Sequence, residues 1–363
     1  MSDWLAVFAS SNTLTESFVD PIYESKPMSR EKALARRVAV TLPAGPAVED
    51  TIERVRWAEA NGYDDAWFAD AGAPDALTLS AGLAAHTQTL RIGVAVTPVF
   101  TRTPAVLAAT ANTLGQLLPG RFVMGLGSSS QTMMENWHGQ TFDKPLTRVR
   151  NTAALVRSML RGEKTKFDLD GLRSQGYSQE AMENPPPIYI AALRSKMIEM
   201  AAEVGDGVIL NLWPRRALPK MMDHIKTGAE RGGKDWRTLE VVNRAMVLVT
   251  DDKSAARDLF RAAFAPYYAT PVYNAFLAWA GFGDAAQTIS EGWAARDRAK
   301  TGGALTDAMI DEIAVIGSAD ECRARLLADM ATGIDTQIIA PLAGASSADV
   351  QRTFEAFTRE RFK

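Results

Sequence analysis

The sequence predicts an α/β protein, a single (β/α)₈ TIM barrel with insertions at the carboxyl-terminal mouth. From residue 38 onward, short apolar runs alternate with helical segments, and eight such runs occur. Two longer segments interrupt this alternation. Strands that alternate with helices are typical of βα units in a parallel sheet, and eight units are the number that closes this type of barrel.

Each apolar run is short enough for a buried strand and is followed by polar or glycine-rich residues. We expect the strands at residues 38–42, 65–69, 91–96, 121–127, 188–192, 207–212, 239–249 and 336–340. Amphipathic periodicity predicts helices at 48–61, 104–118, 146–161, 196–204 and 319–332. Pro104 suits the first turn of its helix, and Gly205 and Gly333 suit the ends of theirs.

The two interrupting segments are residues 162–187, which end in three prolines, and residues 267–310, which are rich in aromatic residues and glycine. Both are long for plain loops. Insertions in a barrel commonly lie over the active mouth, so we expect both there. A dimer contact is an equally good interpretation of the second segment.

Residues 1–36 differ in character from the rest and are interpreted as an N-terminal extension to a barrel domain at 37–363. They combine Pro21, Pro27 and a charged run at 30–37. The segment is either an arm that bridges subunits or a result of the alternative start at Met28.

Composition excludes several classes of function. The chain has 363 residues, of which 47% are hydrophobic and 23% charged, which is ample for a large core. A formal net charge of -3 provides no basic field, so we expect a small-molecule substrate rather than nucleic acid or a membrane. The lone Cys322 and the lack of a signal-like leader favour a cytoplasmic protein.

In a barrel of this type, chemistry is expected where strands end. The predicted ends carry Asp70 after strand two, the serine run 128–130 after strand four, Arg194 after strand five and Trp213 after strand six. They lack the paired carboxylates of a glycosidase and the histidine clusters of a metallohydrolase, so no metal is expected. Glycine, serine and Arg194 together suit an anion, although a glycine-rich turn also occurs as plain strand-to-helix geometry.

Six segments carry a resemblance to a known family. They are IGVAVTPVFTRTPAVLA from Ile92, PGRFVMGLGSSS from Pro119, ENWHGQTFDKPLTRVR from Glu135, PIYIAALRSKM from Pro187, VIGSADECRARL from Val315 and GIDTQIIAPL from Gly333. In order and spacing the chain resembles the luciferase-like monooxygenase superfamily, in its branch that uses the deazaflavin coenzyme F420. The resemblance extends from about residue 38 to 358.

The resemblance implies a non-proline cis peptide at Ala95–Val96 that backs the central ring of the cofactor. It also assigns the phosphate and tail side of the cofactor to two segments after strands four and five. The implied cofactor-binding residues are Ala95, Val96, Thr97, Gly127, Ser128, Ser129, Ser130, Ala192, Leu193 and Arg194. The chain departs from the family pattern at Asp70–Ala71, where some F420 enzymes carry Asp-His, and at Arg194–Ser195, where Gly-Pro is commoner.

Three further residues have both a functional and a structural interpretation. Asp70 is a catalytic candidate that orients the ring or substrate, or else a helix-capping or turn residue. His138, beside Trp137, is a candidate general acid or a residue that packs within its turn. Trp213 either lines a substrate pocket or packs in the core or an interface.

The predicted function is an F420-dependent oxidoreductase that transfers hydride between the deazaflavin and a small organic substrate. The cofactor carries this chemistry, so few acidic or basic groups are needed. The alternatives are an FMN-dependent luciferase-like monooxygenase that uses molecular oxygen, and a non-catalytic barrel that only binds the cofactor. We expect a homodimer.

Overall fold

A closed barrel of eight parallel strands forms the centre of the computed structural model, which describes residues 34–362. The predicted extension at 1–36 therefore lies almost entirely outside the described residues. The last strand pairs with the first, which closes the ring and confirms the predicted barrel. In ring order the strands are β1 (Arg37–Leu42), β2 (Asp65–Phe68), β3 (Arg91–Val94), β5 (Phe122–Gly127), β8 (Ile188–Ala191), β9 (Gly207–Asn211), β10 (Glu240–Val249) and β12 (Thr336–Pro341).

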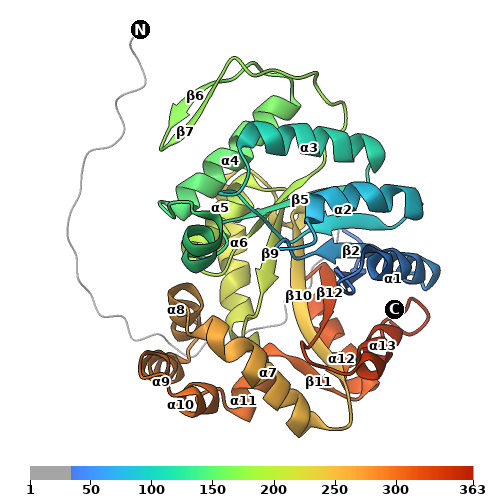
Figure 1. The fold of residues 1–363 in the computed structure, drawn as a ribbon, viewed down its shortest axis with the longest axis vertical. Coiled ribbons are helices and arrows are strands. Elements are labelled where there is room, and N and C mark those ends of the chain that lie inside the picture. The colour runs from blue at the N-terminus through green and yellow to red at the C-terminus, as the bar shows by residue number, and fades with distance from the viewer. Residues whose placement is uncertain (1–33, 363) are drawn as a thin grey trace.

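Helices surround this barrel (Figure 1). They are α1 (Val48–Ala60), α2 (Ala76–Leu83), α3 (Pro104–Leu117), α4 (Pro145–Leu160), α5 (Ser195–Val204), α6 (Leu218–Arg231), α12 (Ala319–Ala331) and α13 (Ser347–Glu355). The helices expected from periodicity agree with these bounds to within one residue at each end. Local signals explain the agreement: Thr103 accepts a hydrogen bond from the Val106 N–H and Pro104 opens α3, while Ser318 and Glu321 form a capping box on α12.

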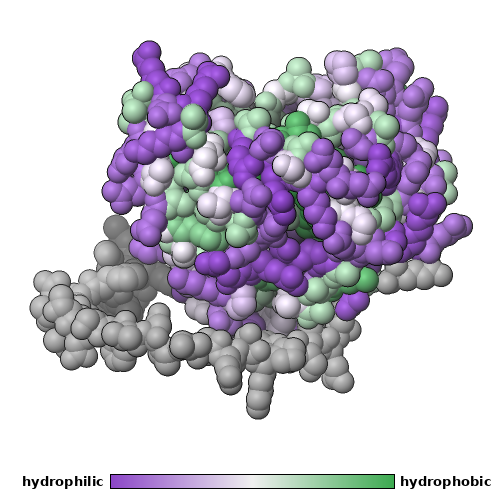
Figure 2. Space-filling view, turned by 90° about the horizontal axis from the view of Figure 1, so that it is seen from below, coloured by the Kyte–Doolittle hydropathy of each residue, from purple (hydrophilic) through white to green (hydrophobic). Residues whose placement is uncertain are grey.

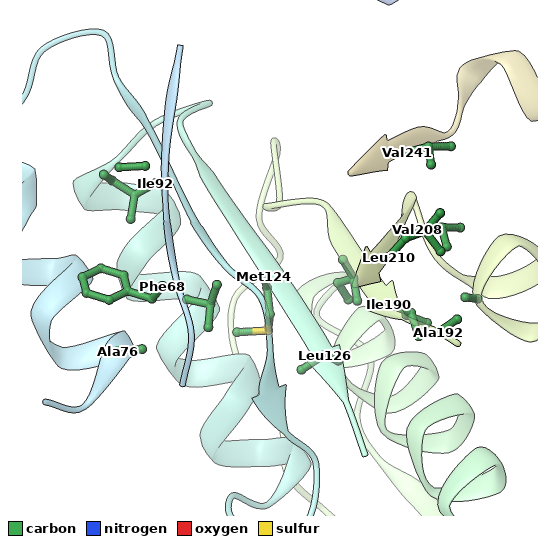
Figure 3. Packing of buried hydrophobic residues seen from close by; sticks show 14 of the residues in the cluster. Phe68, Ala76, Ile92, Met124, Leu126, Ile190, Ala192, Val208, Leu210 and Val241 are labelled. Atoms are coloured by element: carbon green, nitrogen blue, oxygen red, sulfur yellow. The ribbon is translucent and has the colours of Figure 1, made fainter. Parts of the chain in front are cut away.

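Alternate residues of each strand point outward and fill the layer between barrel and helices. Figure 3 shows members of this layer, including Phe68, Met124, Leu126 and Leu210, all of them buried. A buried side chain of this size contributes about 1.5 to 3 kcal/mol relative to an exposed one. Burial on both faces is why these strands read as continuous apolar runs in the sequence.

The other strand face points into the barrel, where the middle layer is made mainly of large side chains. It contains Ala39, Trp67, Val123, Tyr189, Ile209, Val242 and Ile338. The rings of Trp67 and Tyr189 stack with 6.1 Å between their centroids. The layer above it, toward the carboxyl ends of the strands, holds only Ala95, Val96 and Ala191 against this cluster, and these three are partly exposed. The barrel is therefore filled in the middle and opens toward its mouth.

The opposite, amino-terminal end of the barrel is closed by a buried ionic network. Asp65 is fully buried and accepts hydrogen bonds from Arg37 Nε at 2.9 Å and Arg91 Nη2 at 2.6 Å. Arg91 also donates to both oxygens of Glu240, at 2.6 and 2.8 Å, and the Tyr189 hydroxyl donates to Glu240 at 2.6 Å. Every charge here has a partner, as buried ions require.

The segment 162–187 forms a hairpin that lies along the outside of α4. Its strands are β6 (Lys166–Leu169) and β7 (Leu172–Gln175), joined by Asp170 and Gly171 at φ 48° and 76°. The turn returns toward the mouth end of α4, where Lys144 Nζ lies 3.0 Å from the Asp170 carboxylate. Asp-Gly is a standard sequence for a tight hairpin turn with two positive φ angles.

The segment 267–310 belongs to a group of helices at one side of the barrel (Figure 1). They are α7 (Lys253–Tyr268), α8 (Pro271–Trp279), α9 (Gly283–Ala294), α10 (Arg298–Gly303) and α11 (Asp307–Ile313), followed by the short strand β11 (Val315–Gly317). Two bonds attach this group to the rim of the mouth at the end of β9. Asn211 Nδ2 donates to the Tyr273 hydroxyl at 3.3 Å, and the Tyr268 hydroxyl donates to the Leu212 carbonyl at 2.9 Å. The expected position at the mouth is confirmed for this insertion.

On the face shown in Figure 2, hydrophilic side chains predominate, and the hydrophobic residues appear in the gaps between them. Within residues 34–362, none of the helices combines the length and the apolar character needed to cross a bilayer.

Candidate active site at the barrel mouth

The third strand ends earlier than the sequence predicted. β3 stops at Val94, the Ala95–Val96 peptide is cis, and the chain resumes as β4 (Thr97–Pro98), which pairs with β5 at Leu126. The cis bond implied by the resemblance is confirmed. The prediction of one strand over 91–96 was wrong at its end, because Ala95 and Val96 leave the ladder and form a bulge that faces the mouth.

Two glycines of β5 allow this bulge to lie close to the next strand. A Cβ atom on Gly125 would lie 1.7 Å from the Val94 carbonyl oxygen, and one on Gly127 would lie 2.4 Å from Val96 Cγ2. Neither position has room for any side chain. The result is a floor of small groups at the centre of the mouth, formed by Ala95, Val96 and Ala191. Such a surface suits a flat ring.

The hydroxyl of Thr97, next to this floor, is buried and has no hydrogen-bond partner within residues 34–362. Leaving a buried polar group unpaired costs about 1 to 3 kcal/mol, so native proteins rarely do so without a ligand or a water. Thr97 was expected among the cofactor-binding residues. Its orphaned hydroxyl fits a cofactor whose ring edge carries polar atoms.

The serine run lies directly after β5. Ser129 has a φ of 61°, a conformation that non-glycine residues rarely adopt and that often occurs at functional sites. Ser130 accepts a hydrogen bond from the Met133 N–H at 3.3 Å and begins a short helical segment with a π-helix at Met133–Trp137. Ser128, by contrast, donates to the neighbouring Ser129 carbonyl, at 3.2 Å.

Arg194 is exposed at the amino-terminal end of α5 and forms no side-chain hydrogen bond or ion pair in the described part of the chain. Ala192 is buried below it, and Leu193 is partly buried. Since β5 and β8 are neighbours in the barrel, the serine run and Arg194 follow adjacent strands at one side of the mouth. The geometry allows the anion site that the sequence predicted, and its occupant stays a prediction.

Asp70 lies at the end of β2 and is held in an ion pair. Its carboxylate lies 2.9 Å from Arg102 Nη1, and its side chain is only 7% exposed. Arg102 also bonds to Asp75, which caps α2 by accepting from the Thr78 N–H. Burial acts to raise the pKa of Asp75, but the bonds from Thr78 and Arg102 together lower that pKa below its ordinary value. Asp70 is thus fixed in position by a cation that sequence reasoning missed.

His138 and Trp213 are placed differently from Asp70. His138 is exposed at the end of the π-helical segment, beside Trp137, which is 63% exposed. Trp213 is 4% exposed and donates its indole N–H to Asn243 Oδ1 at 2.8 Å. The burial of Trp213 and its bond to Asn243 agree with the interpretation that this side chain packs in the core. Roles for His138 in catalysis and for Trp213 in a substrate pocket stay predictions.

Sequence reasoning also missed a polar group on the β9 and β10 side of the mouth. Asn211, the last residue of β9, pairs with Arg244 in the middle of β10. Asn211 bonds to Tyr273 of the insertion, and Arg244 lies near Tyr267 and Tyr273. The sequence signal for Arg244 is an arginine inside a largely apolar strand. The candidates came from strand ends, so a residue in the middle of a strand was not among them.

Comparison with known proteins agrees with this arrangement. A family model described as luciferase-like monooxygenase matches residues 32–336. A 5,10-methylenetetrahydromethanopterin reductase of Methanolobus tindarius is 28% identical over 302 residues, which cover 82% of this chain and 91% of that protein.

Two solved structures share the fold. The coenzyme F420-dependent tetrahydromethanopterin reductase of Methanopyrus kandleri has a TM-score of 0.75 at 17% identity, with 91% of this chain and 100% of that chain covered. The oxygenating constituent of 3,6-diketocamphane monooxygenase from Pseudomonas putida, in complex with FMN, has a TM-score of 0.67 at 18% identity, with 91% and 98% covered. The mouth geometry and the family match together lead to one conclusion: the chain belongs to the luciferase-like monooxygenase family and is an oxidoreductase.

Proposed function

We propose that this oxidoreductase uses coenzyme F420 and transfers hydride between the deazaflavin and a small organic substrate. The observation that carries the proposal is the floor of the mouth, where a small apolar surface at Ala95 and Val96 lies next to the unpaired Thr97 hydroxyl. The similarity to a methylenetetrahydromethanopterin reductase over most of both chains supports F420 as the cofactor. When bound, the deazaflavin supplies a ring carbon that donates or accepts hydride.

Different residues of the chain then bind different parts of the cofactor. Ala95 and Val96 support the ring, and the Thr97 hydroxyl bonds to its polar edge. Ser128–Ser130 and Arg194 hold the anionic tail, since hydroxyls and a free guanidinium suit phosphate and carboxylate oxygens. Arg102 fixes the Asp70 carboxylate in position, and the carboxylate orients the bound molecules by accepting hydrogen bonds from them.

The middle layer also excludes water from below. Trp67 is 1% exposed and Tyr189 is 5% exposed, so nothing reaches the floor through the barrel. Exclusion of water strengthens electrostatic contacts at the reacting centre and protects a hydride donor from side reactions.

The test is a separate fluorescence titration of the purified protein with F420 and with FMN. We expect F420 to bind at least about tenfold more tightly, a difference of roughly 1.4 kcal/mol. Equal or reversed affinities would contradict the F420 assignment, and tighter binding of FMN would favour the alternative of an FMN-dependent monooxygenase, for which the FMN complex described above is a precedent in this fold.

A further inference from the structure

Arg244 is a deeply placed cation that has no counterion among residues 34–362. It lies on the inner face of β10, two residues beyond Val242 of the inner layer, because side chains alternate along a strand. Its Nε is fully buried and has no hydrogen-bond partner among residues 34–362, and no carboxylate in that range pairs with it. The one polar contact of its side chain there is Nη1 to Met246 Sδ, at 3.7 Å.

The surroundings of Arg244 disfavour a charge. Burial lowers the pKa of Arg244 below its ordinary value, an effect that Tyr267 and Tyr273 only partly oppose. An arginine nevertheless remains charged in proteins. The contrast with the other end of the barrel is direct, since Arg91 there has Asp65 and Glu240 as partners. A buried charge without a partner is costly and needs a reason.

Arg244 is not completely shielded from solvent. The residue as a whole is partly exposed although its Nε is not. Beside it, Asn211 bonds through Nδ2 to Tyr273, while its Oδ1 is buried and unpaired in the described part of the chain. Asn211 and Arg244 are therefore neighbouring, partly exposed residues that each have an unpaired polar atom, an arrangement that suits a ligand subsite.

The strand order fixes where this subsite lies. In the eight-membered ring, β10 is four places from β3, so Arg244 stands across the mouth from the Ala95–Val96 floor. It is also on a different side from Arg194, which follows β8. A molecule that reacts with a ring on the floor must occupy the space between the floor and Arg244.

We propose that Arg244 binds an oxyanion of the substrate, a carboxylate or a phosphate, with Asn211 as its polar neighbour. The proposal rests on the proposed function, because the floor opposite is assigned to the cofactor. A guanidinium matches either oxyanion with two parallel hydrogen bonds, and Tyr267 and Tyr273 provide aromatic walls for the carbon skeleton. The substrate is therefore an organic acid or a phosphate ester rather than a neutral alcohol or ketone.

The experiment begins with the F420 and FMN titrations, which test the proposed function independently. Protein saturated with the tighter cofactor is then titrated calorimetrically with benzoate, phenyl phosphate and benzamide. We expect one of the anions to bind about ten- to a hundredfold more tightly than neutral benzamide, as a charged hydrogen bond predicts. The tighter anion identifies the group.

The variants are Arg244→Met, Arg244→Lys and the control Arg298→Met, a change on the exposed surface of α10. Arg244→Met should lose the preference for anions and keep its cofactor affinity within about twofold of the wild-type value. Arg244→Lys should keep part of the preference for anions, and Arg298→Met should keep all of it. Because Arg244 has no counterion, Arg244→Met should also raise the Tm by about 2 °C or more. If Arg244 only stabilised the fold, the substitution Arg244→Met would instead lower the Tm.

Three results would overturn the proposal. They are equal binding of anions and benzamide by the wild-type protein, an unchanged anion preference in Arg244→Met, and loss of cofactor affinity in Arg244→Met, which would assign the residue to the cofactor. If neither F420 nor FMN binds, the proposed function fails, and the same titrations on the cofactor-free protein still decide whether Arg244 binds an oxyanion.

Discussion

Two buried threonine hydroxyls lack a hydrogen-bond partner within residues 34–362, and they lie in different places. Thr97 is at the mouth floor, whereas Thr152 is inside α4 on the outer layer. The two side chains carry the same unfavourable feature, but only Thr97 lies beside the proposed cofactor site. This pair therefore separates a binding role from a packing role.

We predict that Thr97→Val weakens F420 binding by about two- to tenfold, the value of one neutral hydrogen bond. Thr152→Val should leave F420 affinity unchanged. Both variants should be as stable as the wild-type protein or more stable, because each removes an unpaired buried hydroxyl. Fluorescence titration and thermal unfolding measure these two effects. An equal change of affinity in both variants would place the ring away from Thr97.

Individual site residues were predictable only where a strand end or a family motif marked them. The cis peptide at Ala95–Val96 came from the resemblance, and Asp70 came from its position after a strand. Arg102 and Arg244 were not found, because their roles depend on contacts between distant parts of the chain. No local pattern shows that one arginine has a carboxylate partner and the other has none.

The elements next to the site depend on close contact between β3 and β5. Gly125 has no space for a side chain, since its Cβ would overlap the Val94 carbonyl. By contrast, a Cβ atom on Gly302 of α10 would meet no atom of the described chain within 4 Å. Packing therefore requires glycine at the first position and leaves the second free to carry a side chain.

We predict that Gly125→Ala destabilises the protein by about 3 kcal/mol, because the backbone of β3 or β5 must move. Gly302→Ala should stabilise it by about 0.5 to 1 kcal/mol through reduced freedom of the unfolded chain. Urea unfolding of both variants provides the measurement. If Gly125→Ala is as stable as the wild-type protein, the close approach of the two strands is not needed for folding.

Secondary structure was predictable wherever periodicity and capping acted together, as in α3 and α12. The hairpin of β6 and β7 was missed although Asp170–Gly171 is a recognisable turn sequence, because the segment 162–187 was treated as one insertion and its strands are only four residues long. The division of residues 267–310 into separate helices was also missed. Their packing on one another, seen for α8 with α9, is tertiary and leaves little trace in a short window of sequence.

At the scale of the whole molecule, the ionic network around Asp65 and Glu240 stabilises the end of the barrel where the strands begin. Burial alone would raise the pKa of Glu240, but the hydrogen bonds and charge of Arg91, with bonds from Thr336 and Tyr189, lower that pKa to about 2. A carboxylate with a lowered pKa in the folded state stabilises the fold above its unfolded pKa. That contribution is lost as the pH falls toward the folded value.

We therefore predict that the free energy of unfolding contributed by Glu240 is fully present above pH 4.5, its ordinary pKa, and is lost between there and about pH 2. The contribution is on the order of 3 kcal/mol. Glu240→Gln should be less stable at pH 7 and should lose less stability on acidification. The exposed Glu53→Gln on α1 should follow the wild-type curve in urea unfolding. Parallel curves for wild type and Glu240→Gln would contradict the assignment.

The closed barrel was predictable as a whole because its evidence is distributed over eight repeated units. The predicted division at residue 37 and the expected homodimer depend on residues and contacts outside the described chain and stay predictions. Light scattering of the full-length protein tests the dimer.

The bonds at the end of β9 have a consequence for protein engineering. Three consecutive residues there are each attached to a different group: Asn211 to Tyr273, Leu212 to Tyr268, and Trp213 to Asn243. A chimera that exchanges only residues 267–310 for those of a relative would leave two of these attachments without partners. Transplanting the insertion therefore requires Asn211, Leu212 and α7 to move together with it, whereas Trp213 stays with its partner Asn243.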